Sequence, residues 1–226
     1  YAEKVLAPLG ADVSGSCFLE PDGNFPNHAP NPEDKKALAI ISRRVLETGA
    51  DFGLIFDTDV DRSAAVDENG REIARNGIVA LAAVLAKEIS PGTTIVTDSV
   101  TSDHLSEFLT QRLGLSHLRY KRGYKNVINK AIELNAGGTD CQLAIETSGH
   151  AAFKENYFLD DGAYLAAKIV IKAALLLREG KSLSNVISDL KEPQEAIEVR
   201  LPVTASNFTA YGSQVIKELE AWVQSQ

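Results

Sequence analysis

The sequence predicts an α/β protein with two consecutive three-layer α/β/α units, each built on a mixed sheet, followed by the start of a further domain. Apolar runs of strand length alternate with longer segments whose apolar residues recur at helical spacing. Gly and Pro stand between these segments, where chain reversals are expected. The most apolar of the strand-like runs ends abruptly in polar side chains, as in "LIFDTDVDR" (residues 54–62). Because ligands of α/β sheets bind beyond the carboxyl ends of strands, such endings are the first places to look for a site.

Composition and charge restrict the classes of partner. The chain has 226 residues, of which 44% are hydrophobic and 24% charged, which is enough for a sizeable core in one or two domains. Its net charge of −8 argues against nucleic acid or an anionic membrane surface as the main partner. No apolar run approaches the roughly 20 residues of a spanning helix. Cys17 and Cys141 lie far apart and no apolar leader precedes them, so a reducing cytoplasm is the expected location.

The first unit is expected to span residues 1–75. The sequence has no methionine and opens on what reads as the end of a helix, so it looks like a piece of a longer chain. The expected elements are a strand at 13–18, a Pro-rich loop at 21–32, a helix capped by Asn31 with Leu38, Ile41 and Val45 on its apolar stripe, a strand that ends at Asp57, and a hairpin at 63–73 that turns at Asn69-Gly70.

The second unit is expected to span residues 76–192, and residues 193–226 to begin a third. The apolar pattern starts afresh at Asn76 and again alternates strands with helices, which is typical of an α/β unit. The expected helices are 77–89, 102–113, 124–135 and about 161–178, and the expected strands are 93–98, 117–120 and 141–146; an amphipathic segment at 206–224 follows in the third region.

Three aspartates, Asp57, Asp59 and Asp61, alternate along the short stretch after the first apolar strand. Carboxylates so crowded repel one another, so they either raise each other's pKa or need a cation. Oxygen ligands suit Mg²⁺ or Ca²⁺. An EF-hand fits poorly, because Arg62 stands where that loop requires glycine. The remaining alternative is a solvated acidic turn; we expect instead that the three carboxylates converge on one Mg²⁺-type site at the carboxyl end of the strand.

A second candidate loop is "AIETSGH" (residues 144–150), at the end of another expected strand. Glu146 and Ser148 there can present a carboxylate and a hydroxyl to sugar hydroxyl groups, with His150 beside them. Taken singly, Glu and His are more often ordinary surface or core residues. The binding interpretation requires the loop to be accessible to solvent at the end of a central strand.

Two further stretches carry charge. "RYKRGYKN" (residues 119–126) places Arg119, Lys121, Arg122 and Lys125 around a glycine at a strand-to-helix junction, which suits a phosphate, although a solvated basic face is the plain alternative. Asp160 and Asp161 precede a helix, where capping alone accounts for them.

Taken together and in order, "FPNHAPNPED", "DTDVDR", "GYKN" and "ETSGH" closely resemble the α-D-phosphohexomutases, the phosphoglucomutase and phosphomannomutase family, over essentially the whole chain. The resemblance implies domains 2 and 3 of that family's four, with the opening strand of domain 2 missing from the sequence. It also implies the roles of individual residues: Mg²⁺ ligands at Asp57, Asp59 and Asp61; an arginine beside the family's phosphoserine at Arg62; substrate contacts at Glu146, Ser148, His150 and Lys125. Thr58 and Thr147 depart from the residues that are common in the family at those positions.

The function implied is that of the central portion of a phosphohexomutase, an isomerase that interconverts hexose 1-phosphates and 6-phosphates through a phosphoserine enzyme and Mg²⁺. The serine loop and the phosphate-gripping loop of the family are not found in the sequence, so this portion alone is expected to be inactive. The identity of the hexose, whether glucose, mannose or an amino sugar, stays open, as does the oligomeric state. Two alternatives remain: a haloacid-dehalogenase-like phosphatase with Asp57 as nucleophile, and a non-catalytic module that binds sugar phosphates or metal.

Overall fold

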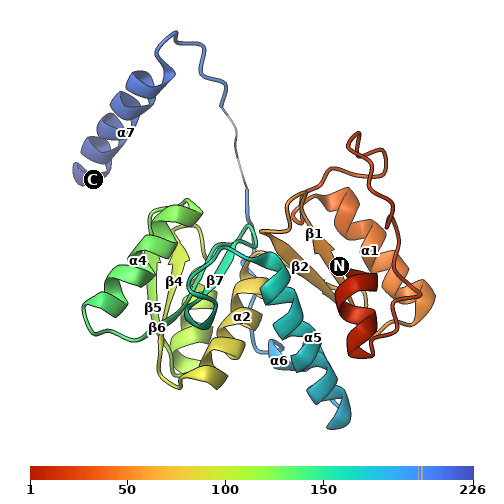
Figure 1. Cartoon of the computed structure of the whole chain (residues 1–226). Coiled ribbons are helices and arrows are strands. Elements are labelled where there is room, and N and C mark those ends of the chain that lie inside the picture. Colours follow the sequence, from red (N-terminus) through yellow and green to blue (C-terminus); the bar gives the residue numbers. More distant parts are fainter. Residues whose placement is uncertain (198, 200) are drawn as a thin grey trace. The chain divides into compact units, whose positions relative to one another are not determined.

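The computed structural model describes residues 1–197, 199 and 201–226, and the chain divides into two compact units, Tyr1–Glu192 and Pro193–Gln226 (Figure 1). The first unit contains two sheets with helices packed against them. The second is considered separately below.

The first sheet is a three-stranded antiparallel sheet in the order β1-β2-β3. Its strands are β1 (Phe52–Phe56), β2 (Ser63–Asp67) and β3 (Glu72–Ile73). The predicted hairpin is confirmed, and Gly70 adopts the positive φ of 73° that its turn requires. Helix α1 (Lys35–Thr48) covers one face, where Leu38 and Val45 pack with Ile55 and Val66.

The second sheet is mixed and has the order β5-β4-β6-β7. The central strand β4 (Thr94–Asp98) runs parallel to β5 (Ser116–Tyr120) and β6 (Cys141–Ile145), whereas β7 (Ala151–Phe153) pairs antiparallel with β6. Parallel strands β4 and β6 are fully buried, as expected for strands with helices on both faces. Helix α4 (Tyr124–Ala136) covers one face through Val127 and Ala131.

Helices α2 (Asn76–Ile89) and α5 (Gly162–Arg178) lie between the two sheets (Figure 1). A single apolar cluster includes Ile73 of the first sheet, Ile95 and Leu143 of the second, and the buried side of both helices. The two sheets therefore share one core, which holds the carboxyl ends of β1 and β6 in a fixed relation. The shorter segments are helices α3 (Asp103–Glu107) and α6 (Leu183–Val186), π-helical turns at Ala2–Leu6 and Phe108–Arg112, and 3₁₀ turns at Ala7–Leu9 and Lys154–Asn156.

Some of the predicted elements are wrong. Residues 13–18 form turns instead of a strand, with Asp12 accepting a hydrogen bond from the backbone N–H of Ser14, and they pair with no strand of either sheet. Helix α1 is capped by Asp34, whose carboxylate accepts from the N–H of Ala37, and not by Asn31. The helix expected at 102–113 changes to a π-helical turn after Glu107. Strand β7 was not predicted.

The second unit, Pro193–Gln226, contains helix α7 (Phe208–Gln224), which has no buried residue. Its start is capped by Asn207, whose side chain accepts from the N–H of Ala210. Among the residues that the structure describes, no helix combines the length and the apolar character needed to cross a bilayer.

Candidate functional site

The three aspartates converge directly after strand β1, as predicted. Carboxylate oxygens of Asp57, Asp59 and Asp61 lie within 4.8 Å of one another. The loop can turn so tightly because Val60 adopts a positive φ of 65°, and its carbonyl is fixed by the N–H of Ala163 at the start of α5. Asp57 is buried and Asp59 is exposed, so the cluster lies at the surface end of the strand.

Arg62 binds Asp57 through two contacts. Its backbone N–H donates to Oδ1 of Asp57 at 3.1 Å and its Nε to Oδ2 at 2.8 Å, while its Nη1 donates to Oδ1 of Asn31 at 3.3 Å. Arg62 is thus oriented on both sides, by the acidic loop and by the loop before α1. The two bonds from Arg62 occupy one lone pair on each carboxylate oxygen of Asp57.

The electrostatics of the aspartate cluster fit a bound cation. Burial, followed by a hydrogen bond with Asp57, raises the pKa of Asp61 to about 6. Burial acts on the pKa of Asp57 in the same direction, but the hydrogen bonds from Asp61 and Arg62 outweigh it and lower that pKa. Below about pH 6 the two carboxyls therefore share one proton, held by Asp61. In the described part of the chain, Oδ1 of Asp61 is buried and has no hydrogen-bond partner. A divalent ion on three carboxylates would replace this proton.

Glu146 follows strand β6 and is more buried than predicted. Only 5% of its surface is exposed, so the expectation of an open loop is wrong at this residue. Its Oε1 accepts a hydrogen bond of 2.6 Å from the backbone N–H of Gly123, at the start of α4. Burial raises the pKa of Glu146, and the bond from Gly123 opposes this shift. Through this bond the side chain of Glu146 joins the loop at residues 146–150 to the start of α4.

Residues 147 and 148 of the same loop have different surroundings. Thr147 donates its hydroxyl to Oδ2 of Asp98 at 2.9 Å, which anchors the loop to the end of the neighbouring strand β4. Burial raises the pKa of Asp98, although bonds from Thr147 lower it in part. Among the residues that the structure describes, the hydroxyl oxygen of Ser148 is buried and has no hydrogen-bond partner, so its hydrogen-bonding capacity is unused.

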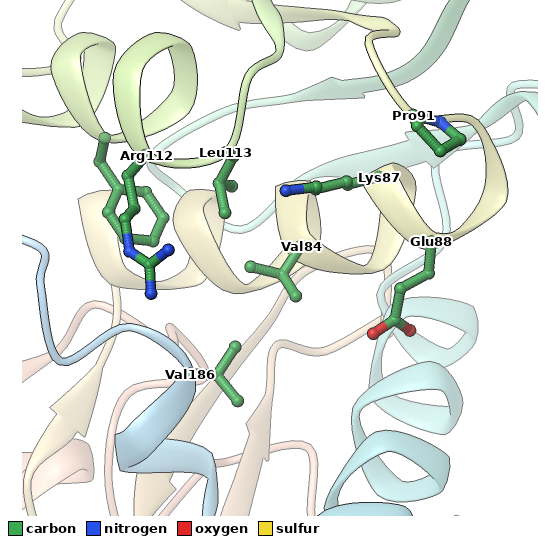
Figure 2. Close-up of a pocket in the computed structure, with 8 residues that line it drawn as sticks. Val84, Lys87, Glu88, Pro91, Arg112, Leu113 and Val186 are labelled. Atoms are coloured by element: carbon green, nitrogen blue, oxygen red, sulfur yellow. The ribbon is translucent and has the colours of Figure 1, made fainter.

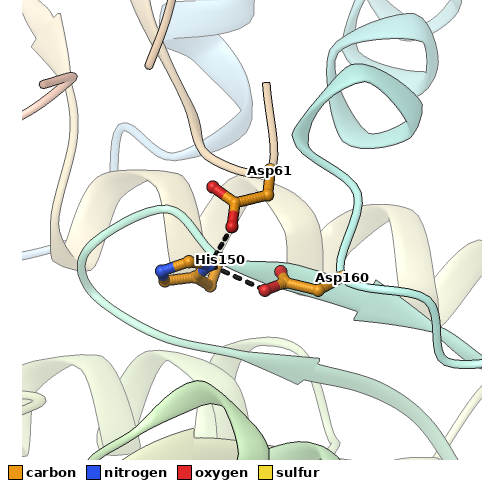
Figure 3. Close-up of side chains that lie close together, drawn as sticks. All are labelled: Asp61, His150 and Asp160. Carbon is orange, nitrogen blue, oxygen red and sulfur yellow. Dashed lines mark hydrogen bonds and ion pairs between the residues drawn. The ribbon is translucent and has the colours of Figure 1, made fainter. Parts of the chain in front are cut away.

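His150 is surrounded by groups from three separate segments, and Figure 3 shows two of them, which carry Asp61 and Asp160. Its Nδ1 lies 2.8 Å from Oδ2 of Asp160 and 3.6 Å from Oδ2 of Asp61. The ring of Tyr124 stacks on the imidazole with centroids 4.9 Å apart. Asp161 caps α5 as predicted, but Asp160 binds His150 instead of the helix. Sequence reasoning missed the contribution of Asp160, Tyr124 and Asp98 because these contacts depend on the tertiary fold.

The aspartate loop and the loop at residues 146–150 are held together by the backbone. Arg62 and His150 form an antiparallel β-bridge, and the N–H of Ser63 donates to the carbonyl of Gly149. Glycines permit this approach: a Cβ at Gly149 would lie 2.6 Å from the carbonyl oxygen of Ser63, and one at Gly162 would lie 2.6 Å from the carbonyl carbon of Arg62. The two predicted loops therefore belong to one site.

The predicted basic cluster at 119–126 does not come together as a whole. Arg119 donates to Oδ1 of Asp103 at 2.7 Å and to Oγ1 of Thr101, away from the glycine. Lys125 is exposed, with its Nζ 5.8 Å from the centroid of the Tyr124 ring. Lys125 thus stands beside the aromatic residue that contacts His150.

A pocket of about 380 Å³ lies elsewhere, between α2, the π-helical turn at Phe108–Arg112 and α6 (Figure 2). Val84, Leu113 and Val186 line it together with Lys87 and Arg112. None of the predicted site residues takes part, and Arg112 is already paired with Asp189. This pocket is separate from the site described above.

Family comparisons agree with the fold. The model "Phosphoglucomutase/phosphomannomutase, alpha/beta/alpha domain II" matches residues 1–70, and the corresponding domain III model matches residues 75–193. A phosphomannomutase/phosphoglucomutase of Pseudomonas syringae is 33% identical over 90% of this chain and 42% of its own length. A phosphoglucomutase of Neisseria gonorrhoeae is 31% identical over 98% of this chain and 45% of its own length.

Solved structures show the same relationship. A phosphoglucomutase/phosphomannomutase family protein from Burkholderia thailandensis matches with 31% identity and a TM-score of 0.65, covering 78% of this chain and 36% of that one. The open form of parafusin from Paramecium has the same fold at a TM-score of 0.63 and 17% identity, covering 84% of this chain and 34% of that one. The chain spans less than half the length of the curated relatives named above. On these matches, the chain belongs to the phosphoglucomutase/phosphomannomutase family and corresponds to its domains II and III.

Proposed function

We propose that this chain supplies the metal-binding and sugar-binding loops of an enzyme that transfers a phosphoryl group between the 1- and 6-positions of a hexose phosphate. The observation that carries the proposal is the β-bridge between Arg62 and His150, which joins the two loops in one site. Transfer between two positions of one sugar needs a charged phosphoryl group and a sugar ring to be held side by side. In this proposal the aspartate loop faces the phosphoryl group and the loop at residues 146–150 faces the sugar ring.

In this proposal Asp57, Asp59 and Asp61 hold Mg²⁺, for which three carboxylates are a suitable donor set. When bound, the ion would supply positive charge where the phosphoryl group carries negative charge. Arg62, fixed by Asp57 and Asn31, directs its guanidinium group toward a phosphoserine carried by the rest of the enzyme. A rigid cation of this kind binds phosphate oxygens without further reorganisation.

Substrate recognition is assigned to Glu146, Ser148 and His150, with Lys125 beside them. The unpartnered hydroxyl of Ser148 and the second oxygen of Glu146 are the groups we assign to sugar hydroxyls. Lys125 is exposed at the start of α4 and is assigned to the substrate's phosphate. Hexose phosphates are therefore the proposed substrates. The identity of the sugar, whether glucose, mannose or an amino sugar, stays open.

We also propose the domain limits 1–75, 76–192 and 193–226, which agree with family matches at 1–70 and 75–193. A cytoplasmic location stays a prediction from composition. The phosphatase alternative has no support in the family assignment. A non-catalytic role would be excluded by mutase turnover of the complete protein.

Asp59→Asn in a complete enzyme that carries these loops tests the metal assignment. We expect the conversion of glucose 1-phosphate to the 6-phosphate, with Mg²⁺ and a trace of the 1,6-bisphosphate, to fall by roughly 10²-fold because one metal ligand loses its charge. Asp51→Asn, at an exposed acid just before β1, is the control and should leave turnover unchanged. Equal rates for the two variants would contradict the assignment.

This chain alone should show no sustained turnover in the same assay, because it holds the metal and sugar loops without a serine donor. It should also release no phosphate from hexose phosphates, with or without Mg²⁺. Turnover that survives complete removal of host mutase would show that the donor lies within these 226 residues.

A further inference from the structure

The imidazole of His150 is fixed on several sides by residues that the roles assigned above do not use. Asp160 contacts Nδ1 at 2.8 Å, and Tyr124 stacks on the ring face at an interplanar angle of 21°. The backbone of His150 is held by its bridge to Arg62 and by its carbonyl, which accepts from the N–H of Glu146. A side chain restrained in this way has few other orientations available.

The contact with Asp160 also selects one tautomer. A carboxylate can only accept, so the Nδ1 that faces it must carry the proton. In a neutral ring Nε2 then has the lone pair. Asp160 is free for this purpose because its neighbour Asp161 caps α5.

The second ring nitrogen is left available. Within the described part of the chain, every polar contact of the His150 ring is made by Nδ1, and Nε2 has no hydrogen bond. Figure 3 shows the other nitrogen of the ring on the side away from both aspartates. The unpartnered hydroxyl of Ser148 belongs to the same loop.

We propose that Asp160 is a positioning residue that, with Tyr124, holds His150 as the Nδ1–H tautomer and presents Nε2 to a hydroxyl group of the substrate. The tautomer and the orientation concern this chain alone, whereas the identity of the hydroxyl as that of a hexose phosphate rests on the proposed function. In this arrangement Nε2 accepts a hydrogen bond from the sugar. Without Asp160, Nδ1 faces only Asp61, whose Oδ2 lies 3.6 Å away and beyond hydrogen-bond distance. The ring can then adopt the other tautomer, which can only donate from Nε2.

The test is nitrogen-15 NMR of the chain, with the four histidines labelled and His150 assigned from a His150→Gln variant. Burial lowers the pKa of His150, but Asp160 and Asp61 outweigh it and raise that pKa above its ordinary value. The pH is therefore raised to about 9 or beyond, until the imidazole is neutral; there Nδ1 of His150 should give a protonated-type shift and Nε2 an unprotonated-type shift. Asp160→Ala should change the tautomer ratio by about tenfold toward Nε2–H. Asp160→Asn should retain the preference, because its amide oxygen still accepts. Asp103→Ala, at an exposed aspartate on α3, is the matched control.

An Nε2–H tautomer in the unaltered chain, or an unchanged ratio in Asp160→Ala with native circular dichroism, would overturn the proposal. A second measurement separates it from the proposed function. In a complete enzyme, Asp160→Ala should lower kcat by about tenfold with little change in KM if Nε2 acts on the reacting hydroxyl. A complete enzyme without mutase turnover, but with the expected NMR result, would refute the proposed function and the choice of hydroxyl while leaving the positioning role of Asp160 in place.

Discussion

At the scale of single residues, Gly149 decides how closely the aspartate loop and the loop at residues 146–150 approach. Its φ is +98°, and a Cβ there would lie 2.6 Å from the carbonyl oxygen of Ser63. Gly149→Ala should therefore lower the free energy of unfolding by more than the backbone strain alone. Urea denaturation followed by circular dichroism measures this cost.

The matched control is Gly138→Ala. Gly138 has a similar φ of +86°, but a Cβ there would meet nothing within 4 Å. Both variants carry the strain of a positive φ, so their difference isolates the close approach, which we expect to add about 1–3 kcal/mol. If the two variants lost equal stability, the two loops would not be in the tight contact described.

Asp98 gives a prediction about pH. Burial raises the pKa of this carboxyl above its ordinary value, so ionisation costs more in the folded than in the unfolded chain. Its contribution to stability is complete below the unfolded pKa of about 3.9 and is lost as the pH rises through the folded pKa. Asp98→Asn cannot ionise. The free energy of unfolding of the unaltered chain, relative to this variant, should fall from about pH 4 upward; a difference independent of pH would contradict the burial of Asp98.

Some of these residue-level features can be predicted from sequence and others cannot. Asp57, Asp59 and Asp61 converge because a short loop after a buried strand leaves them little room to diverge. The contact of Thr147 with Asp98 spans 49 positions and exists only because β4 and β6 are neighbours. Asp160 could be mistaken for a cap because the capping residue, Asp161, is adjacent to it.

At the scale of elements, two residues compete as the N-terminal cap of α1, Asn31 and Asp34. Asn31 was the expected cap, but its side chain accepts from the N–H of Glu33 and from Arg62, while Asp34 accepts from Ala37. Asp34→Ala should lower the free energy of unfolding by about 1 kcal/mol and weaken the helical circular dichroism signal. Asp12→Ala, which removes a similar bond in an exposed turn outside any helix, should cost less. Equal losses would mean that capping is not what Asp34 contributes.

The elements that sequence could predict are those with long apolar patterns. The alternation of strands and helices in residues 76–178 is confirmed, apart from the second half of the helix expected at 102–113. Most of these segments bury apolar side chains in the shared core, and α4 buries Val127 and Ala131 in a separate cluster on the other face of the second sheet. Strand β7 has only three residues, Ala151–Phe153, and follows a glycine loop, so no period could identify it. Residues 13–18 have apolar residues of strand type but pair with no strand in this structure, and strand formation depends on such a partner.

At the scale of the whole molecule, the division into two units follows from where apolar surface is buried. The shared core of both sheets lies within residues 1–192, whereas α7 in residues 193–226 buries none of its side chains. Cooperative unfolding requires shared buried contacts, so the two units should report different transitions. The chain offers a natural probe of this division, because its single tryptophan, Trp222, lies on α7 and is 59% exposed.

Tryptophan fluorescence and circular dichroism should therefore disagree during denaturation. In the native chain, emission from Trp222 should already have the red-shifted maximum of an indole in water, and it should change little while the circular dichroism signal of residues 1–192 is lost cooperatively. The double variant Trp222→Phe/Tyr164→Trp moves the probe next to buried Phe153, whose ring centroid lies 5.8 Å from that of Tyr164. Its fluorescence transition should coincide with the circular dichroism transition. Coincident transitions in the unaltered chain, starting from blue-shifted emission, would instead show that α7 is buried against other parts of the protein in solution.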